Sequence, residues 1–188
     1  MVEIRKEKEK IYTINILNLV KFQVEQGIIT SVRNILSSNS TISYVKIFFD
    51  GGCATKDRLG VFGCSFYLND KKLFQIAGNI GPNNTSNTSE YFGLVMAIIF
   101  LDLLQIKDFN IVKVKIFSDS ELVCRQVQGI YNINTPHILI LNLIVKSILK
   151  KFQCKIEIEH ILRKFNEEAD RLANTGKTLE NNCFVVNY

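Results

Sequence analysis

The sequence contains no long hydrophobic run and no regular cysteine pattern. Its longest apolar stretch, around residues 94–101, is followed at once by Asp102 and is far shorter than the roughly 18 residues needed to cross a bilayer. The five cysteines are odd in number, widely spaced and never arranged as Cys-x-x-Cys, which argues against a disulfide framework and a zinc site. We therefore expect no membrane-spanning segment and predict a reducing intracellular compartment, with cytoplasm, nucleus and mitochondrion not distinguished.

The sequence also lacks an extreme charge and the composition of a disordered chain. Hydrophobic residues make up 47% and charged residues 22%, so the chain can bury a sizeable core, which excludes wholesale disorder. The net charge of +5 suits a polyanionic partner without requiring one. A length of 188 residues predicts one compact domain with about 40 residues to spare.

The chain divides into an N-terminal extension, residues 1–43, and an α/β domain, residues 44–188. Apolar residues recur at three- and four-residue steps from Ile11 to Leu36, with a break at Gly27, which predicts two helical pieces followed by a polar linker. The first ten residues lack the apolar core and cleavage site of a secretory signal, so we expect no cleaved leader. Two interpretations of the extension stay open: an appendage packed on the domain, or a docking helix for a protein partner.

Residues 44–188 predict a mixed α/β domain without internal repeats. An Asn69-Asp70 turn between the second and third strands predicts a hairpin, and Pro136 is a favoured first residue of a helix. The changes in hydrophobic periodicity predict strands at 44–50, 60–68, 71–77, 111–117 and 155–161, and helices at 88–105, 121–128, 136–152 and 166–175.

Four acidic residues occupy positions typical of functional groups in such a domain. Asp50 and Asp119 each end an apolar strand, at the edge where α/β folds place their sites. Glu90 lies near the start of an apolar helix, and Asp170 lies in the last helix. If these elements converge, mutual repulsion of the carboxylates requires protons or cations, and Mg²⁺ is the natural oxygen-liganded metal.

Each of these residues also has an ordinary structural explanation. Asp50 before two glycines can be a turn residue, and Glu90 can complement a helix dipole. Asp119 can cap the helix that follows it, while Asp170 can be a solvated charge on its helix. Their common order and spacing favour the functional interpretation.

The segments around these residues resemble the four motifs of type I ribonuclease H. The resemblance covers about residues 44–175, and a fifth match is His160, which stands ten residues before the last aspartate, as the family's catalytic histidine does. It implies a five-stranded mixed sheet of order 3-2-1-4-5, with strand 2 antiparallel and helices on both sides. The matching segments are Phe49-Asp50-Gly51-Gly52-Cys53, Asn87-Thr88-Ser89-Glu90-Tyr91, Ser118-Asp119-Ser120-Glu121-Leu122-Val123 and residues 160–170.

The resemblance implies an endonuclease that hydrolyses the RNA strand of an RNA–DNA hybrid by a two-metal mechanism. Two Mg²⁺ ions, with Mn²⁺ as a substitute, would be held by the four carboxylates, and His160 would assist proton transfer or product release. The 2′-hydroxyl would distinguish RNA from DNA. The implied substrate contacts are Gly52, Cys53, Asn87 and Asn166.

Two departures from the family keep alternatives open. Tryptophan is absent, and only Lys146, Lys150 and Lys151 cluster where some members carry a basic protrusion that grips the hybrid; plant and archaeal members also do without it. Residues 1–43 do not resemble the small hybrid-binding domain of many eukaryotic relatives. The alternative function is a structural subunit of a ribonucleoprotein, for example an organellar ribosome, docked through residues 1–43. A strand-transferring or junction-cleaving relative fits the Asn87 motif and the His160 spacing less well.

Overall fold

The computed structural model describes residues 43–55, 57–103, 111–180 and 184–187. Their elements alternate between strands and helices, as the hydrophobic periodicity predicts. The elements are β1 (Ser43–Cys53), β2 (Gly60–Leu68), β3 (Lys71–Asn79), α3 (Ser86–Leu103), β4 (Ile111–Ser118), α4 (Glu121–Val127), α5 (Pro136–Leu149), β5 (Lys155–His160), the 3₁₀ turn η2 (Arg163–Phe165), α6 (Glu167–Thr175), the 3₁₀ turn η3 (Gly176–Thr178) and β6 (Phe184–Asn187).

The strands form one mixed sheet in the order β5-β4-β1-β2-β3-β6. β4 lies parallel to both β1 and β5, whereas β2 is antiparallel to β1 and to β3. The predicted order of five strands is therefore confirmed. A sixth strand was not predicted: β6 is only four residues long and pairs antiparallel with the edge of β3, so its pattern alone is too short to indicate a strand.

The turn between β2 and β3 confirms the predicted hairpin. Asn69 and Asp70 have φ values of 46° and 67°, and this left-handed backbone suits the two central residues of a type I′ turn. The Asn69 side chain also accepts a hydrogen bond from the backbone N–H of Tyr44 at 3.0 Å, which ties the turn to the start of β1.

β1 is longer than predicted. Asp50 does not end this strand, because Gly51 and Gly52 continue to pair with Phe62 and Val61 of β2 up to Cys53. The parallel pairing with β4, in contrast, stops at Phe48 and Phe117. Asp50 therefore still lies just beyond the carboxyl edge of the parallel strands, where the sequence places a functional group.

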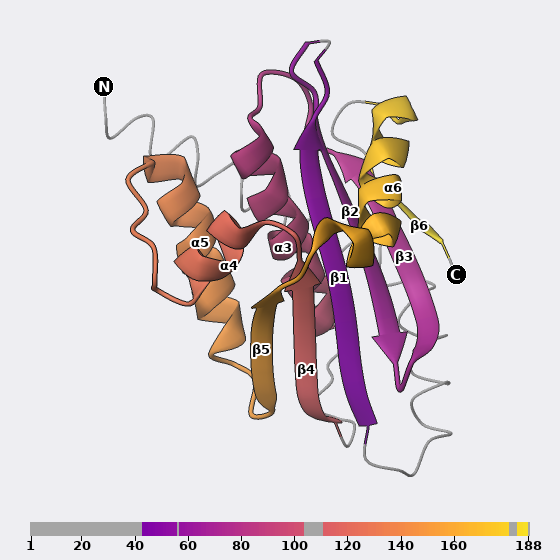
Figure 1. The fold of residues 1–188 in the computed structure, drawn as a ribbon, viewed down its shortest axis with the longest axis vertical. Helices are drawn as coiled ribbons and strands as arrows, with labels where there is room; N and C mark the ends of the chain where they lie inside the picture. The colour runs from indigo at the N-terminus through magenta and orange to yellow at the C-terminus, as the bar shows by residue number, and fades with distance from the viewer. Residues whose placement is uncertain (1–42, 56, 104–110, 181–183, 188) are drawn as a thin grey trace.

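The helices form a layer on each side of the sheet (Figure 1). α3 packs on β1 and β2 and contacts α5, whereas α6 lies on the opposite face against the β1–β2–β3 part of the sheet. Almost every residue of α3 from Ser89 to Leu101 is buried, which explains why this helix is apolar nearly all round. Glu90, half-buried, is the one carboxylate within this stretch.

Two glycines let the helix backbones approach the sheet closely. A Cβ atom at Gly51 would lie 2.3 Å from the backbone nitrogen of Glu90 in α3. A Cβ atom at Gly63, in β2, would lie 2.4 Å from the backbone nitrogen of Ala173 in α6. Any side chain at these positions would push a helix away, so the glycines set the distance between the sheet and both helices.

The predicted helical extension lies outside the described residues, and docking through it stays a prediction. The first described strand begins at Ser43, the last residue assigned to that extension. The predicted helix 88–105 begins two residues earlier, at Ser86, and its last two residues are also outside the described part. No helix within the described ranges is long and apolar enough to span a bilayer.

We predict that Gly63→Ala lowers the free energy of unfolding by about 2 to 3 kcal/mol, because the new methyl group would overlap the α6 backbone. Gly52→Ala is the matched control: its Cβ would have only Val61 Cγ2 nearby, at 3.7 Å, so we expect a change below about 1 kcal/mol. Urea denaturation of both variants measures the difference. Equal effects would show that α6 is not seated on Gly63.

Candidate active site

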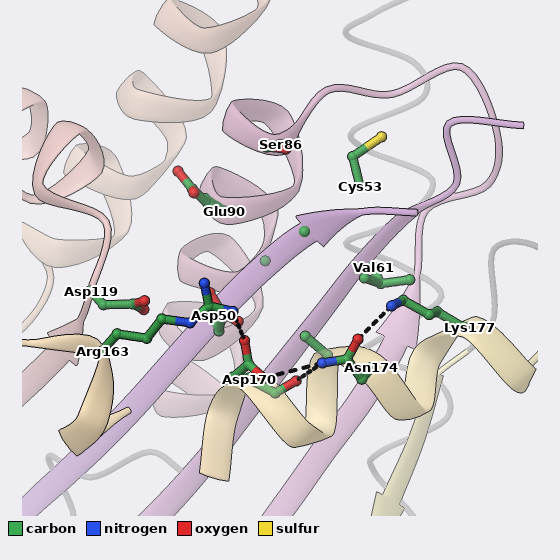
Figure 2. A pocket seen from close by; sticks show the side chains of 13 residues that line it. Asp50, Cys53, Val61, Ser86, Glu90, Asp119, Arg163, Asp170, Asn174 and Lys177 are labelled. Carbon is green, nitrogen blue, oxygen red and sulfur yellow. Dashed lines mark hydrogen bonds and ion pairs between the residues drawn. The ribbon is translucent and has the colours of Figure 1, made fainter. Parts of the chain in front are cut away.

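A cleft of about 270 Å³ opens at the carboxyl edge of β1 and β4. The four predicted carboxylates all line it, although they come from a strand, two helices and a loop (Figure 2). The lining residues are Asp50, Gly51, Gly52, Cys53, Val61, Ser86, Glu90, Asp119, Arg163, Asp170, Ala173, Asn174 and Lys177. The fold therefore brings the predicted acidic residues together.

Asp50 is the most perturbed of the four carboxyl groups. Burial raises its pKa to about 7, and the charges of Asp119, Asp170 and Glu90 act in the same direction, while the backbone N–H of Gly51 partly offsets them. The negative charge of the neighbouring carboxylates thus opposes ionisation of Asp50. A cation in the cleft would relieve this repulsion.

Glu90 is held by a hydroxyl group from the next helix. Ser120 Oγ donates a hydrogen bond to Glu90 Oε2 at 2.6 Å and accepts one from the backbone N–H of Val123 at 3.4 Å, as the N-cap of α4. Burial raises the pKa of Glu90, and the Ser120 hydrogen bond works against that rise. Ser120 was not among the predicted site residues, although it follows Asp119 directly.

Asn166 lies beneath the cleft and holds Asp119. Its Nδ2 atom donates to Asp119 Oδ1 at 2.6 Å and to the backbone carbonyl of Phe49 at 3.0 Å. The residue is 1% exposed, so almost none of its surface is open to solvent. Asn166 therefore contacts Asp119 from below the cleft, which its place before a helix could not reveal, and its predicted contact with substrate stays a prediction.

Asp170 is surrounded by polar side chains that were not predicted. Arg163 Nη2 donates to Asp170 Oδ1 at 2.6 Å, and Asn174 Nδ2 donates to Asp170 Oδ2 at 3.2 Å (Figure 2). Lys177 in turn donates to Asn174, so a line of side chains runs from Asp170 along α6 into η3. The spacing 170, 174, 177 is typical of one helix face and could have identified this line from the sequence.

Of the other predicted site residues, two line the cleft and two lie outside its lining. Gly52 and Cys53 line the cleft, and the Cys53 thiol contacts the backbone carbonyl of Asn84 at 3.4 Å. Asn87 is exposed in the first turn of α3 and is not among the lining residues of the described cleft. His160 is exposed at the end of β5, paired with Ser118 of β4, and is likewise outside the lining.

The four carboxylates match the donor chemistry of a hard metal ion. Three of them turn to separate donors: Glu90 to Ser120, Asp119 to Asn166 and Asp170 to Arg163. In this arrangement no three His, Cys, Asp or Glu side chains of the described ranges are grouped closely enough to hold one metal ion. The residues fit Mg²⁺ by type and by location, and binding requires the carboxylates to come closer together than they are in this arrangement.

Proteins similar to this chain in sequence and fold include ribonucleases H. The chain is 28% identical over 130 residues to ribonuclease HI of Halobacterium salinarum; the match covers 69% of this chain and 62% of that protein's length. The crystal structure of RNase H1 from the same archaeon superposes with a TM-score of 0.62 at 27% identity, covering 71% of this chain and 97% of that one. LC11-RNase H1, solved in complex with an RNA/DNA hybrid, gives a TM-score of 0.64 at 26% identity, covering 70% and 94%.

The family model described as reverse transcriptase-like matches residues 48–176. This range begins just before Asp50 and ends just after α6, so it contains all four carboxylates of the cleft. The chain therefore belongs to the reverse transcriptase-like family and, within it, to the type I ribonucleases H.

Proposed function

We propose that the chain is a metal-dependent endonuclease that hydrolyses the RNA strand of RNA–DNA hybrids. The observation that carries the proposal is the convergence of Asp50, Glu90, Asp119 and Asp170 on one cleft. Burial, together with the charges of the neighbouring carboxylates, raises the pKa of Asp50, and a cation bound in the cleft would offset both effects. The hybrid-bound relative LC11-RNase H1 supports the choice of substrate.

Two Mg²⁺ ions, or Mn²⁺ in their place, fit the four carboxylates. Asp50 would contact both ions, Asp119 would hold the one on the side of the attacking water, and Glu90 and Asp170 would hold the other. Bound there, the ions lower the pKa of the attacking water and stabilise the charge on the attacking and leaving oxygens. Ser120 and Asn166 keep Glu90 and Asp119 oriented.

Cationic side chains of the cleft complete the mechanism. Arg163 and Lys177 line the cleft and offer positive charge to the phosphate groups of a bound strand. His160 is at the end of β5, paired with Ser118, which directly precedes Asp119. From there we propose that it assists proton transfer or product release. Gly52 and Cys53 leave room for the substrate along β1.

We predict Mg²⁺-dependent cleavage of a labelled RNA–DNA hybrid by the purified chain, with about 1,000-fold or greater loss in Asp50→Asn and Asp119→Asn, because each removes a negative metal ligand. Glu121→Gln is the matched control, since Glu121 is exposed, pairs with Arg125 and does not line the cleft. Gel assays with hybrid, double-stranded RNA and double-stranded DNA identify the substrate. Wild-type cleavage at the level of Asp50→Asn would refute the proposal.

We predict that Asp50→Asn stabilises the metal-free protein more at pH 8 than at pH 5. The folded-state pKa of Asp50 is raised to about 7, so the folded protein binds more protons than the unfolded chain between pH 4 and pH 7, and stability is lost as pH rises through this window. Neutral asparagine removes this penalty, which a rise of about three pKa units sets at about 4 kcal/mol at pH 8.

Urea denaturation in a chelating buffer at both pH values measures this difference, with Glu121→Gln as the control that should show no such trend. Millimolar Mg²⁺ should raise the melting temperature of the wild type at pH 8 more than that of Asp50→Asn. A pH-independent effect of Asp50→Asn would contradict the assigned electrostatics.

A further inference from the structure

The turn between β5 and α6 projects from the protein beside the cleft and is fixed at both ends. At its start, the backbone N–H of Ile161 donates to the carbonyl of Ser118 at 2.9 Å. At its end, the buried Asn166 side chain is bonded to Phe49 and Asp119. Residues 162–165 therefore protrude between two anchors that belong to the strands of the site.

The backbone of this turn is also ordered internally. The N–H of Phe165 donates to the carbonyl of Leu162 at 2.8 Å, and the N–H of Asn166 donates to that of Arg163 at 2.9 Å, which forms η2. Because these bonds close the turn, its backbone and the directions of its Cα–Cβ bonds are fixed. We call residues 162–165 the projecting turn.

The projecting turn exposes two large apolar side chains. Leu162 is 61% and Phe165 63% exposed, which are the highest values among the large hydrophobic residues of the described ranges. Neither side chain belongs to the hydrophobic core. A four-residue turn that exposes two large apolar side chains to solvent is typical of a contact surface.

The residues between them are both cationic. Arg163 reaches into the cleft and pairs with Asp170; Figure 2 shows its side chain extending toward Asp50 and Asp119. Lys164 places Nζ 4.9 Å from the centre of the Phe165 ring. Within the described part of the chain, no carboxylate is paired with Lys164, although the exposed Glu167 begins the helix that follows.

We propose that the projecting turn grips the sugar–phosphate backbone of the nucleic-acid strand that enters the cleft. Such a backbone alternates charged phosphates with apolar sugar faces, and the turn offers two cations flanked by two apolar side chains. Lys164 pairs with a phosphate next to the one that faces Arg163, while Leu162 and Phe165 pack on the adjoining sugars. The inference rests on the proposed function and supplies a contact to substrate in a chain without the tryptophan-bearing basic protrusion.

The test is hybrid binding by the full chain, measured by fluorescence anisotropy in an Asp50→Asn background so that the substrate stays intact. Phe165→Ala should weaken binding about three- to tenfold through lost apolar contact, while Phe165→Tyr should retain it. Lys164→Ala should reduce the slope of log Kd against log salt concentration by about one, as expected for one lost phosphate contact.

Matched controls come from residues that do not line the cleft. Leu143 of α5 is 57% exposed, so Leu143→Ala removes a similarly exposed apolar side chain, and Lys71→Ala removes an exposed cation at the start of β3; neither should change the affinity or the salt slope. Equal melting temperatures of Phe165→Ala and its parent would exclude a folding defect.

Two outcomes separate this inference from the proposed function. If the wild type cleaves the hybrid but Phe165→Ala and Lys164→Ala bind it as the parent does, the projecting turn is not a substrate contact and the nuclease function stands. If the wild type neither cleaves nor binds the hybrid, the proposed function fails and the inference fails with it. Loss of a protein partner in Phe165→Ala with unchanged hybrid affinity would also overturn the inference.

Discussion

The close approach of two helices to the central strands is the constraint on which the site depends. α3 carries Glu90 and α6 carries Asp170, and both helices contact β-strand backbone where glycine leaves no side chain between them. Gly51 follows Asp50, and Gly63 is paired with Asp50 across β1 and β2. Asp50 is thus enclosed from both faces of the sheet, and the distance between carboxylates is set by backbone packing.

This packing imposes an electrostatic cost that the neighbouring residues reduce. Enclosure removes water from Asp50 and raises its pKa to about 7, with the other carboxylates adding to the effect. Each of the other three is stabilised by a different donor, a serine hydroxyl, an asparagine amide or an arginine guanidinium. Ser120, Asn166 and Arg163 therefore hold the negative groups in place at the carboxyl edge of the sheet.

Hydrophobic periodicity and residue chemistry were enough to predict the five main strands, the helices of the domain and the four carboxylates. The Asn69-Asp70 turn was predictable because few residues tolerate two successive left-handed conformations. Gly51 and Gly52 led to the wrong prediction that β1 ends at Asp50, because glycine is typical of turns as well as of close backbone contacts. β6 and the burial of Asn166 depend on contacts between segments distant in sequence, which no local pattern encodes.

Arg163 is a cationic side chain of the cleft that the motif spacing did not single out. It stands seven residues before Asp170 and pairs with it, whereas the role predicted for His160 in proton transfer or product release stays a prediction. A guanidinium stays charged throughout the physiological pH range, whereas an imidazole loses its charge near neutrality. The positive charge at the mouth of this cleft is therefore permanent, and the turn that carries Arg163 also exposes Lys164, Leu162 and Phe165 to whatever strand approaches it.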